Sequence, residues 1–193
     1  MRDRDRFAVD FVTRLAIQAG YQDYGSTTST LRSTAQLVGQ DPEPDVFGWN
    51  NAVYKQPGSL ALSTDTQITN GNRPGNCSVS DTSCVNGSDV LVIRFQGATS
   101  AIDATKSDNS MINCLGQGEM SVASGNYDQR SINILHVTRS ANGEPSLSCS
   151  YYNFASGNWV GPTPMIEGVE TFQVLYGTDA VTPGTASGAA GDT

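Results

Sequence analysis

Apolar and polar residues alternate most regularly over residues 169–176, which read V-E-T-F-Q-V-L-Y. In an extended chain Phe172, Val174 and Tyr176 point to one side, while Thr171 and Gln173 point to the other. This period of two is typical of a strand with one face in a core and one face near water. A glycine flanks the run on each side, so the pattern predicts a strand bounded by two turns.

Other parts of the chain also carry a strand pattern. Residues 89–96 are the clearest of these, with an apolar residue at every second position. Residues 132–138 and 146–154 flank a short loop that contains Gly143, which predicts a β-hairpin. The weaker strand candidates are residues 46–54 and the stretch that begins at Trp159.

Residues 5–19 have the period of an amphipathic helix. Phe7, Phe11 and Leu15 recur on one face at intervals of four, which predicts that they pack the helix on the sheet. Gly20 follows the last turn, where glycine often ends a helix.

Val9 and Ile17 lie off that helix face, and two interpretations stay open for them. Single apolar residues are common on protein surfaces, so these two can be ordinary exposed side chains. The alternative is that they contact neighbouring subunits of an assembly.

One helix followed by an antiparallel meander predicts an α+β fold with long loops. We expect a single globular domain over residues 1–193, with the helix in residues 1–21. A body of loops and β-sheet would occupy residues 22–177. Residues 178–193 have the composition of a flexible tail.

The chain is acidic, with a formal net charge of −8. Its first fourteen residues contain four Arg and three Asp and contribute +1, so the remainder carries −9. Nucleic-acid binding needs clustered Lys and Arg, and an anionic membrane surface attracts a polybasic segment. The acidic body argues against both kinds of partner.

The chain contains four cysteines, which are Cys77, Cys84, Cys114 and Cys149. An even number with no C-x-x-C pair and a single histidine argues against a metal site. It favours two disulfides formed in an oxidising compartment. Of the three possible pairings we prefer Cys77–Cys84, which closes a short polar loop, and Cys114–Cys149, which ties a loop to a predicted strand.

No catalytic residue and no cofactor is predicted. His136 is the only histidine, and a lone histidine in a strand is usually structural. The sequence has no phosphate-binding loop and no dinucleotide fingerprint. Aromatic residues on a β scaffold can bind sugars or a protein, or can pack the sheet. Both interpretations stay open for Tyr127, Tyr151, Tyr152 and Trp159.

Several motifs, in order along the chain, resemble one known family. Residues 168–179 read G-V-E-T-F-Q-V-L-Y-G-T-D, and residues 88–98 read S-D-V-L-V-I-R-F-Q-G-A. Shorter matching pieces are N-C-L-G at 113–116, the strand at 132–137, and G-E-P-S-L-S-C at 143–149. Together with residues 6–21, which resemble the second half of a pilin's long first helix, these motifs resemble PilW-type minor pilins of bacterial type IV pili.

The resemblance implies a type IV pilin-like fold and a structural subunit that is not an enzyme. It implies a tip complex with other minor pilins that primes pilus assembly, with a PilY-type tip adhesin as a further partner. The implied location is the inner membrane, facing the periplasm, and then the extracellular pilus tip. Because no run approaches the ~18 apolar residues of a membrane span, we expect a soluble fragment that lacks the leader and the apolar half-helix, its only membrane contact.

Two alternatives stay open. One is a GspJ-like minor pseudopilin of type II secretion, although the motifs at 88–98 and 165–179 fit the PilW type better. The other is a secreted carbohydrate-binding β module or hydrolase, which would need a concave site with exposed aromatics or convergent acids.

Overall fold

The computed structural model describes residues 2–21, 45–52, 54, 85–121, 130–153 and 157–176. Within these residues one α-helix precedes five β-strands. They are α1 (Arg2–Ala16), β1 (Val46–Trp49), β2 (Val90–Phe95), β3 (Ser131–Arg139), β4 (Pro145–Asn153) and β5 (Asn158–Glu167). The predicted α+β class, with an amino-terminal helix and an antiparallel sheet, is therefore confirmed.

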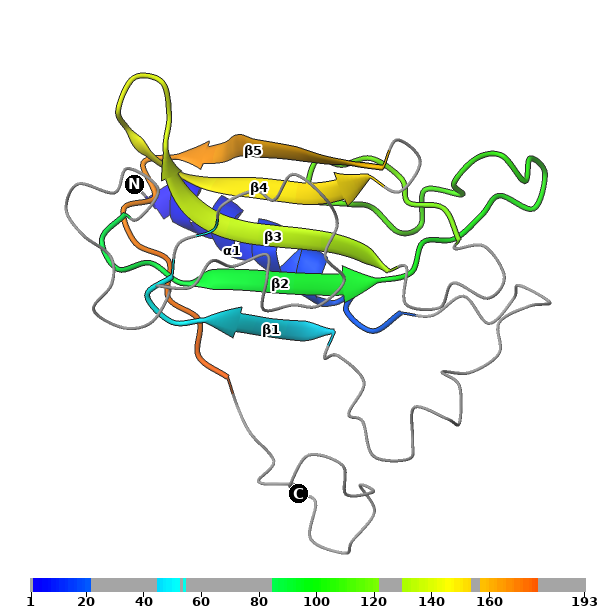
Figure 1. Ribbon diagram of the computed structural model, residues 1–193, viewed down its shortest axis with the longest axis horizontal. Coiled ribbons are helices and arrows are strands. Elements are labelled where there is room, and N and C mark those ends of the chain that lie inside the picture. The colour runs from blue at the N-terminus through cyan, green and yellow to red at the C-terminus, as the bar shows by residue number, and fades with distance from the viewer. Residues whose placement is uncertain are drawn as a thin grey trace, which may run out of the picture.

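The five strands form one sheet in the order β1-β2-β3-β4-β5, and every adjacent pair is antiparallel. Each strand thus pairs with its neighbour in sequence, as expected for a meander. Figure 1 shows α1 lying across one face of this sheet, behind the central strands. Gly143, with φ of 86°, turns β3 into β4 as the hairpin pattern predicts.

The face of the sheet below α1 holds the larger apolar core. The register aligns Leu91 with Leu135 and Leu135 with Cys149, so that one row of side chains crosses three strands. Leu15 of α1 packs against this row. The buried members of this core on the sheet are Leu91, Ile93, Phe95, Leu135, Leu147, Cys149, Tyr151 and Ile166.

The opposite face of the sheet is also buried. Its apolar cluster includes Val92, Ile134, Tyr152 and Trp159. All six residues of β2 are buried, which explains why its sequence V-L-V-I-R-F reads as a nearly continuous apolar run.

The strand predicted over residues 169–176 is wrong, because these residues form no strand of the sheet. The last strand is β5, which runs through Pro162 and Pro164 rather than ending at them. Proline is tolerated there because β5 lies at the edge of the sheet, where an outward N–H group is not needed to bond a neighbouring strand. Gly168, with φ of 82°, then turns the chain off the sheet while its N–H donates to the carbonyl oxygen of Pro145 at 2.8 Å.

Several predictions fall outside the described residues. They are the Cys77–Cys84 disulfide, the role of Tyr127 and the flexible tail at residues 178–193. In the described part of the chain no helix is long and apolar enough to cross a membrane.

Candidate functional site

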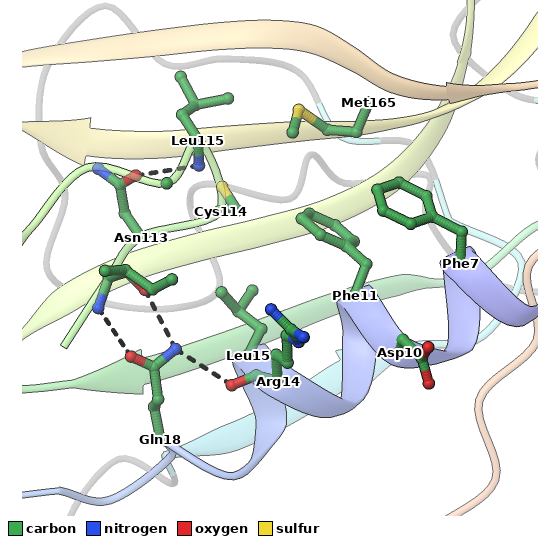
Figure 2. A pocket seen from close by; sticks show the side chains of 12 residues that line it. Phe7, Asp10, Phe11, Arg14, Leu15, Gln18, Asn113, Cys114, Leu115 and Met165 are labelled. Atoms are coloured by element: carbon green, nitrogen blue, oxygen red, sulfur yellow. Dashed lines mark hydrogen bonds between the residues drawn. The ribbon is translucent and has the colours of Figure 1, made fainter. Parts of the chain in front are cut away.

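The helix α1 is seated on the sheet by its carboxy-terminal half. Leu15 is 3% exposed, and Phe11 is partly buried against the same core. Phe7 differs from the expectation for this face, because 57% of its side chain is exposed. The ring of Phe7 lines an open cavity of about 330 Å³ beside Met165 of β5, so it lies at the rim of the core rather than within it (Figure 2).

Gln18 fixes the end of the helix to a distant loop. Its amide nitrogen donates to the carbonyl oxygen of Ile112 at 3.1 Å and to that of Arg14 at 3.2 Å. Its amide oxygen accepts from the N–H of Ile112 at 2.8 Å (Figure 2). The helix predicted over residues 5–19 lies nearer the amino end, because α1 ends at Ala16 and residues 17–20 form turns. Gly20 therefore does not stop the helix; it has φ of 76° and its N–H donates to the carbonyl oxygen of Arg94.

The outer side of α1 carries an exposed stripe made of Val9, Thr13 and Ile17. These residues are four positions apart, so they line up along one side of the helix. Val9 is 65% exposed and Ile17 is 76% exposed. The two residues predicted as subunit contacts are therefore open to solvent, and the helix presents them together with the hydroxyl of Thr13.

Residues 168–176, here called the strap, run alongside the start of α1 and cross from β5 toward β1 (Figure 1). Val169, Phe172 and Val174 are partly buried against the core, while the residues between them are exposed. The predicted alternation is therefore present in the burial of the side chains, although the segment belongs to no sheet. The hydroxyl of Tyr176 lies against Gly48 of β1, where a larger side chain would collide with it.

Hydrogen bonds to residues 86–89 hold the strap in place. The Asp89 N–H donates to the carbonyl oxygen of Phe172 at 2.8 Å, and the Asp89 carboxylate accepts from the N–H of Val174 at 2.8 Å. The same carboxylate accepts from the N–H of Asn51 at 2.9 Å. Ser88 accepts from the N–H of Phe172 at 3.1 Å. Burial, and then the charge of Asp89, raises the pKa of Tyr176 to about 12.

A second groove, of about 550 Å³, lies between α1 and the strap. Among the described residues that line it, the charged ones are Asp5 and Glu170, and none is Lys or Arg. Its apolar lining residues are Ala8, Val9, Val12, Leu147, Val169 and Phe172. The helix therefore forms a ridge between this groove, here called the strap groove, and the cavity beside Phe7.

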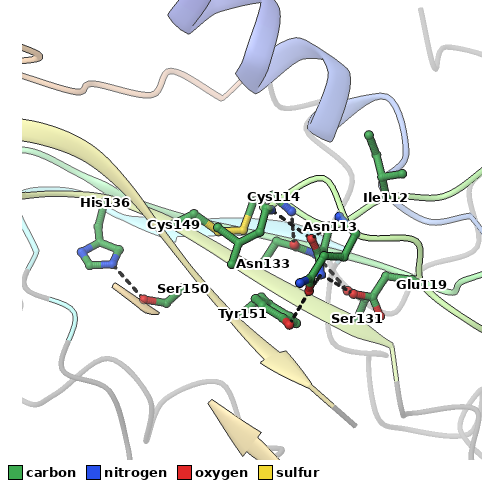
Figure 3. The surroundings of a disulfide bond; sticks show 12 residues. Ile112, Asn113, Cys114, Glu119, Ser131, Asn133, His136, Cys149, Ser150 and Tyr151 are labelled. Atoms are coloured by element: carbon green, nitrogen blue, oxygen red, sulfur yellow. Dashed lines mark hydrogen bonds between the residues drawn. A yellow bond between two sulfur atoms is a disulfide. The ribbon is translucent and has the colours of Figure 1, made fainter. Parts of the chain in front are cut away.

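The disulfide between Cys114 and Cys149 is present, and it joins the 113–117 turn to β4 below the helix (Figure 3). Asn113 shapes the turn, because its side-chain oxygen accepts from the N–H groups of Leu115 and Gln117. Its amide nitrogen donates to Glu119 at 2.8 Å. Burial raises the pKa of Glu119, and this hydrogen bond opposes the shift.

His136 is buried on the face of the sheet opposite α1. Its Nε2 lies 3.3 Å from the Ser150 hydroxyl, but its Nδ1 has no hydrogen-bond partner among the residues that the structure describes (Figure 3). Burial lowers the pKa of His136 to about 3. A histidine of this kind is a weak base, no group orients it, and both residues of the pair are inaccessible to a substrate. The contact therefore serves the packing of β3 on β4.

Three of the four aromatic residues considered for sugar binding, those that the structure describes, pack the sheet. Tyr151 is 3% exposed, Tyr152 is 7% exposed and Trp159 is 9% exposed. Tyr152 and Trp159 stack edge to face with ring centroids 5.3 Å apart. The described residues also contain no group of three or more His, Cys, Asp or Glu side chains that could hold a metal ion.

Sequence reasoning missed Asp89, Gln18 and the two hollows beside α1. The sequence contains one indication of the role of Asp89, which is an acidic residue placed directly before an apolar strand. The sequence contains no indication of the role of Gln18, because its partner Ile112 is 94 positions away.

Comparison with protein families finds a match in the carboxy-terminal part of the chain. The family model described as type IV Pilus-assembly protein W (PilW) matches residues 134–190. The described part of this range contains most of β3, all of β4 and β5, and the strap. No curated protein and no solved structure matches the chain.

Proposed function

We propose that this PilW-type pilus protein is a minor pilin, a non-enzymatic subunit that primes type IV pilus assembly in a tip complex with other minor pilins. The observation that carries the proposal is the family match over β3–β5 and the strap, which are the elements that hold α1 on the sheet. A pilin-like fold, with α1 as the second half of a longer helix, belongs to the same proposal. So does a location in the inner membrane and then at the pilus tip.

The exposed stripe of α1 is the surface that we assign to subunit contact. Val9 and Ile17 lie on the side of the helix away from the buried Leu15, so they are free to meet another subunit while the domain stays folded. Exposing two β-branched side chains to water on one helix face is unfavourable in free energy. Burial in an assembly would remove that cost.

Strand addition at β5 is the less suitable mode of contact. An exposed edge strand can pair with a partner's strand through its free N–H groups. Pro162 and Pro164 remove two such groups from β5, which is the usual way that a protein protects an edge. We therefore place the main contact on α1, and not on this edge.

The proposal is tested by deleting the gene and complementing it with variants of the full-length protein. The double variant Val9→Glu with Ile17→Glu is expected to reduce pilus number toward that of the deletion strain, and to lose binding to the cognate minor pilins in a pull-down. Ile102→Glu is the matched control, because Ile102 is 99% exposed but lies on a loop away from α1. Normal pilus number in the deletion strain, together with no binding by the full-length protein, would overturn the proposal.

A further inference from the structure

We infer that the strap groove binds an apolar segment of a neighbouring pilus subunit that carries Lys or Arg beside its apolar side chains. This inference rests on the proposed function for the source of the segment. It adds a second contact site, which shares Val9 and Thr13 with the exposed stripe of α1 and differs from it in carrying the acidic residues Asp5 and Glu170.

The groove has the size and lining of a binding site. Its volume of about 550 Å³ lies in the range of pockets that hold ligands. Val12 and Leu147 form part of its apolar surface, and Val9 lies at its rim with 65% of its side chain exposed. Apolar side chains of a partner would remove this surface from water, which is the main favourable contribution to association.

The charges around the groove select a basic partner. Asp5 and Glu170 line it and both are exposed, while none of its described lining residues is a cation. Arg4 lies at one end, beside Gly168, and is not part of the lining. A second copy of this chain would bring another −8 of net charge to the groove, so a different subunit with a basic segment is the better match.

The groove is preformed, because its outer wall is tied down. The Asn86 side chain donates to the carbonyl oxygen of Glu170 at 2.8 Å, and the Gln173 side chain donates to the carbonyl oxygen of Gly87 at 2.9 Å. Together with the bonds of Asp89, these contacts hold the strap away from the helix. A partner therefore need not order the strap when it binds, which favours affinity.

The test is a titration of the isotope-labelled 193-residue chain with helical peptides, followed by NMR. One peptide carries a leucine stripe flanked by lysines, and the second carries the same stripe flanked by glutamates. The third peptide has the sequence of this chain's own α1. We expect the lysine peptide to shift the signals of Ala8, Val12 and Val169 and to bind more tightly than the other two.

Two pairs of variants sharpen the test. Glu170→Lys is expected to weaken binding of the lysine peptide about fivefold, while Asp10→Lys, which makes the same charge change in the cavity beside Phe7, leaves it nearly unchanged. Val9→Ser is expected to weaken binding, while Ile17→Ser, on the same helix but outside the groove, is not. All four positions are exposed, so the fold is retained.

Three results would overturn the inference. They are equal binding of the lysine and glutamate peptides, equal effects of Glu170→Lys and Asp10→Lys, and signal shifts confined to the cavity beside Phe7. Tighter binding of the α1 peptide would assign the groove to a second copy instead. A strain that needs the gene for pili, but whose protein binds no peptide, would reject this inference and leave the proposed function standing.

Discussion

The carboxylate of Asp89 accepts a hydrogen bond from the main chain of Val174, a residue 85 positions later in the sequence. Asp89 is 5% exposed and lies directly before β2, whereas Val174 lies near the end of the strap. One buried side chain thus connects the start of β2 to the segment that forms the outer wall of the strap groove.

Replacing Asp89 with Ala is expected to destabilise the protein by roughly 1–3 kcal/mol, because the N–H groups of Asn51 and Val174 lose a buried acceptor. Urea unfolding measures the loss, and hydrogen exchange should speed up at Val174 before it does in β3. The control is Asp103→Ala, which removes a similar carboxylate contact on an exposed loop. An equal effect of the two substitutions would contradict the role of Asp89.

Three alanine substitutions along α1 should rank by burial. Leu15→Ala is expected to cost about 2–5 kcal/mol, because its side chain is fully within the core. Phe7→Ala is expected to cost less than about 1 kcal/mol, since that ring is mostly exposed. Phe11→Ala should fall between them. Thermal or urea unfolding provides the measurement, and a large loss for Phe7→Ala would place its ring in the core after all.

Removing the Cys114–Cys149 disulfide is expected to cost about 4 kcal/mol, because the bond closes a loop with a sequence separation of 35. The double variant with both cysteines changed to Ser avoids a free thiol, and its unfolding is compared with that of the unmodified protein. Peptide mapping without reduction checks both predicted pairs. Recovery of a peptide that joins Cys77 to Cys114 would reject the pairing.

Stability should fall in acid partly through His136. Burial lowers the pKa of this residue to about 3 in the folded protein, whereas an unfolded histidine titrates at about 6.5. The unfolded chain binds the proton first, so the free energy of unfolding decreases by about 1.4 kcal/mol for each pH unit between these two values.

The substitution His136→Gln tests that contribution. Carboxylates also titrate in this range, so the informative quantity is the difference between the two proteins in unfolding free energy at each pH. We expect the unmodified protein to lose stability more steeply below about pH 6.5. Parallel curves for the two proteins would show that His136 is not held neutral by burial.

The sequence predicted the fold well wherever local pattern and tertiary environment agree. The strand at β2 and the hairpin of β3 and β4 follow from apolar runs and from Gly143. Each of these features depends on residues close in sequence, so its signal is local.

The strap shows where such reasoning fails. Alternation over residues 169–176 predicts that every second side chain is covered, and the structure agrees for Phe172 and Val174 but not for Tyr176, which is exposed. The pattern does not say what covers those side chains, and here it is the core beside α1 together with residues 86–89 rather than a neighbouring strand. The exposure of Phe7 is likewise decided by the distance to β5, which no helical pattern contains.

The two hydrogen bonds between Gln18 and the main chain of Ile112 have a mechanical consequence. They lie side by side, so a pull along α1 loads both bonds at once instead of breaking them in turn. Beyond Ile112 the force passes within two residues to Cys114, and then through a covalent bond into β4. The end of the helix thus has a second connection to the sheet beside the chain that follows Gly20, and this connection ends on β4, a strand paired on both sides.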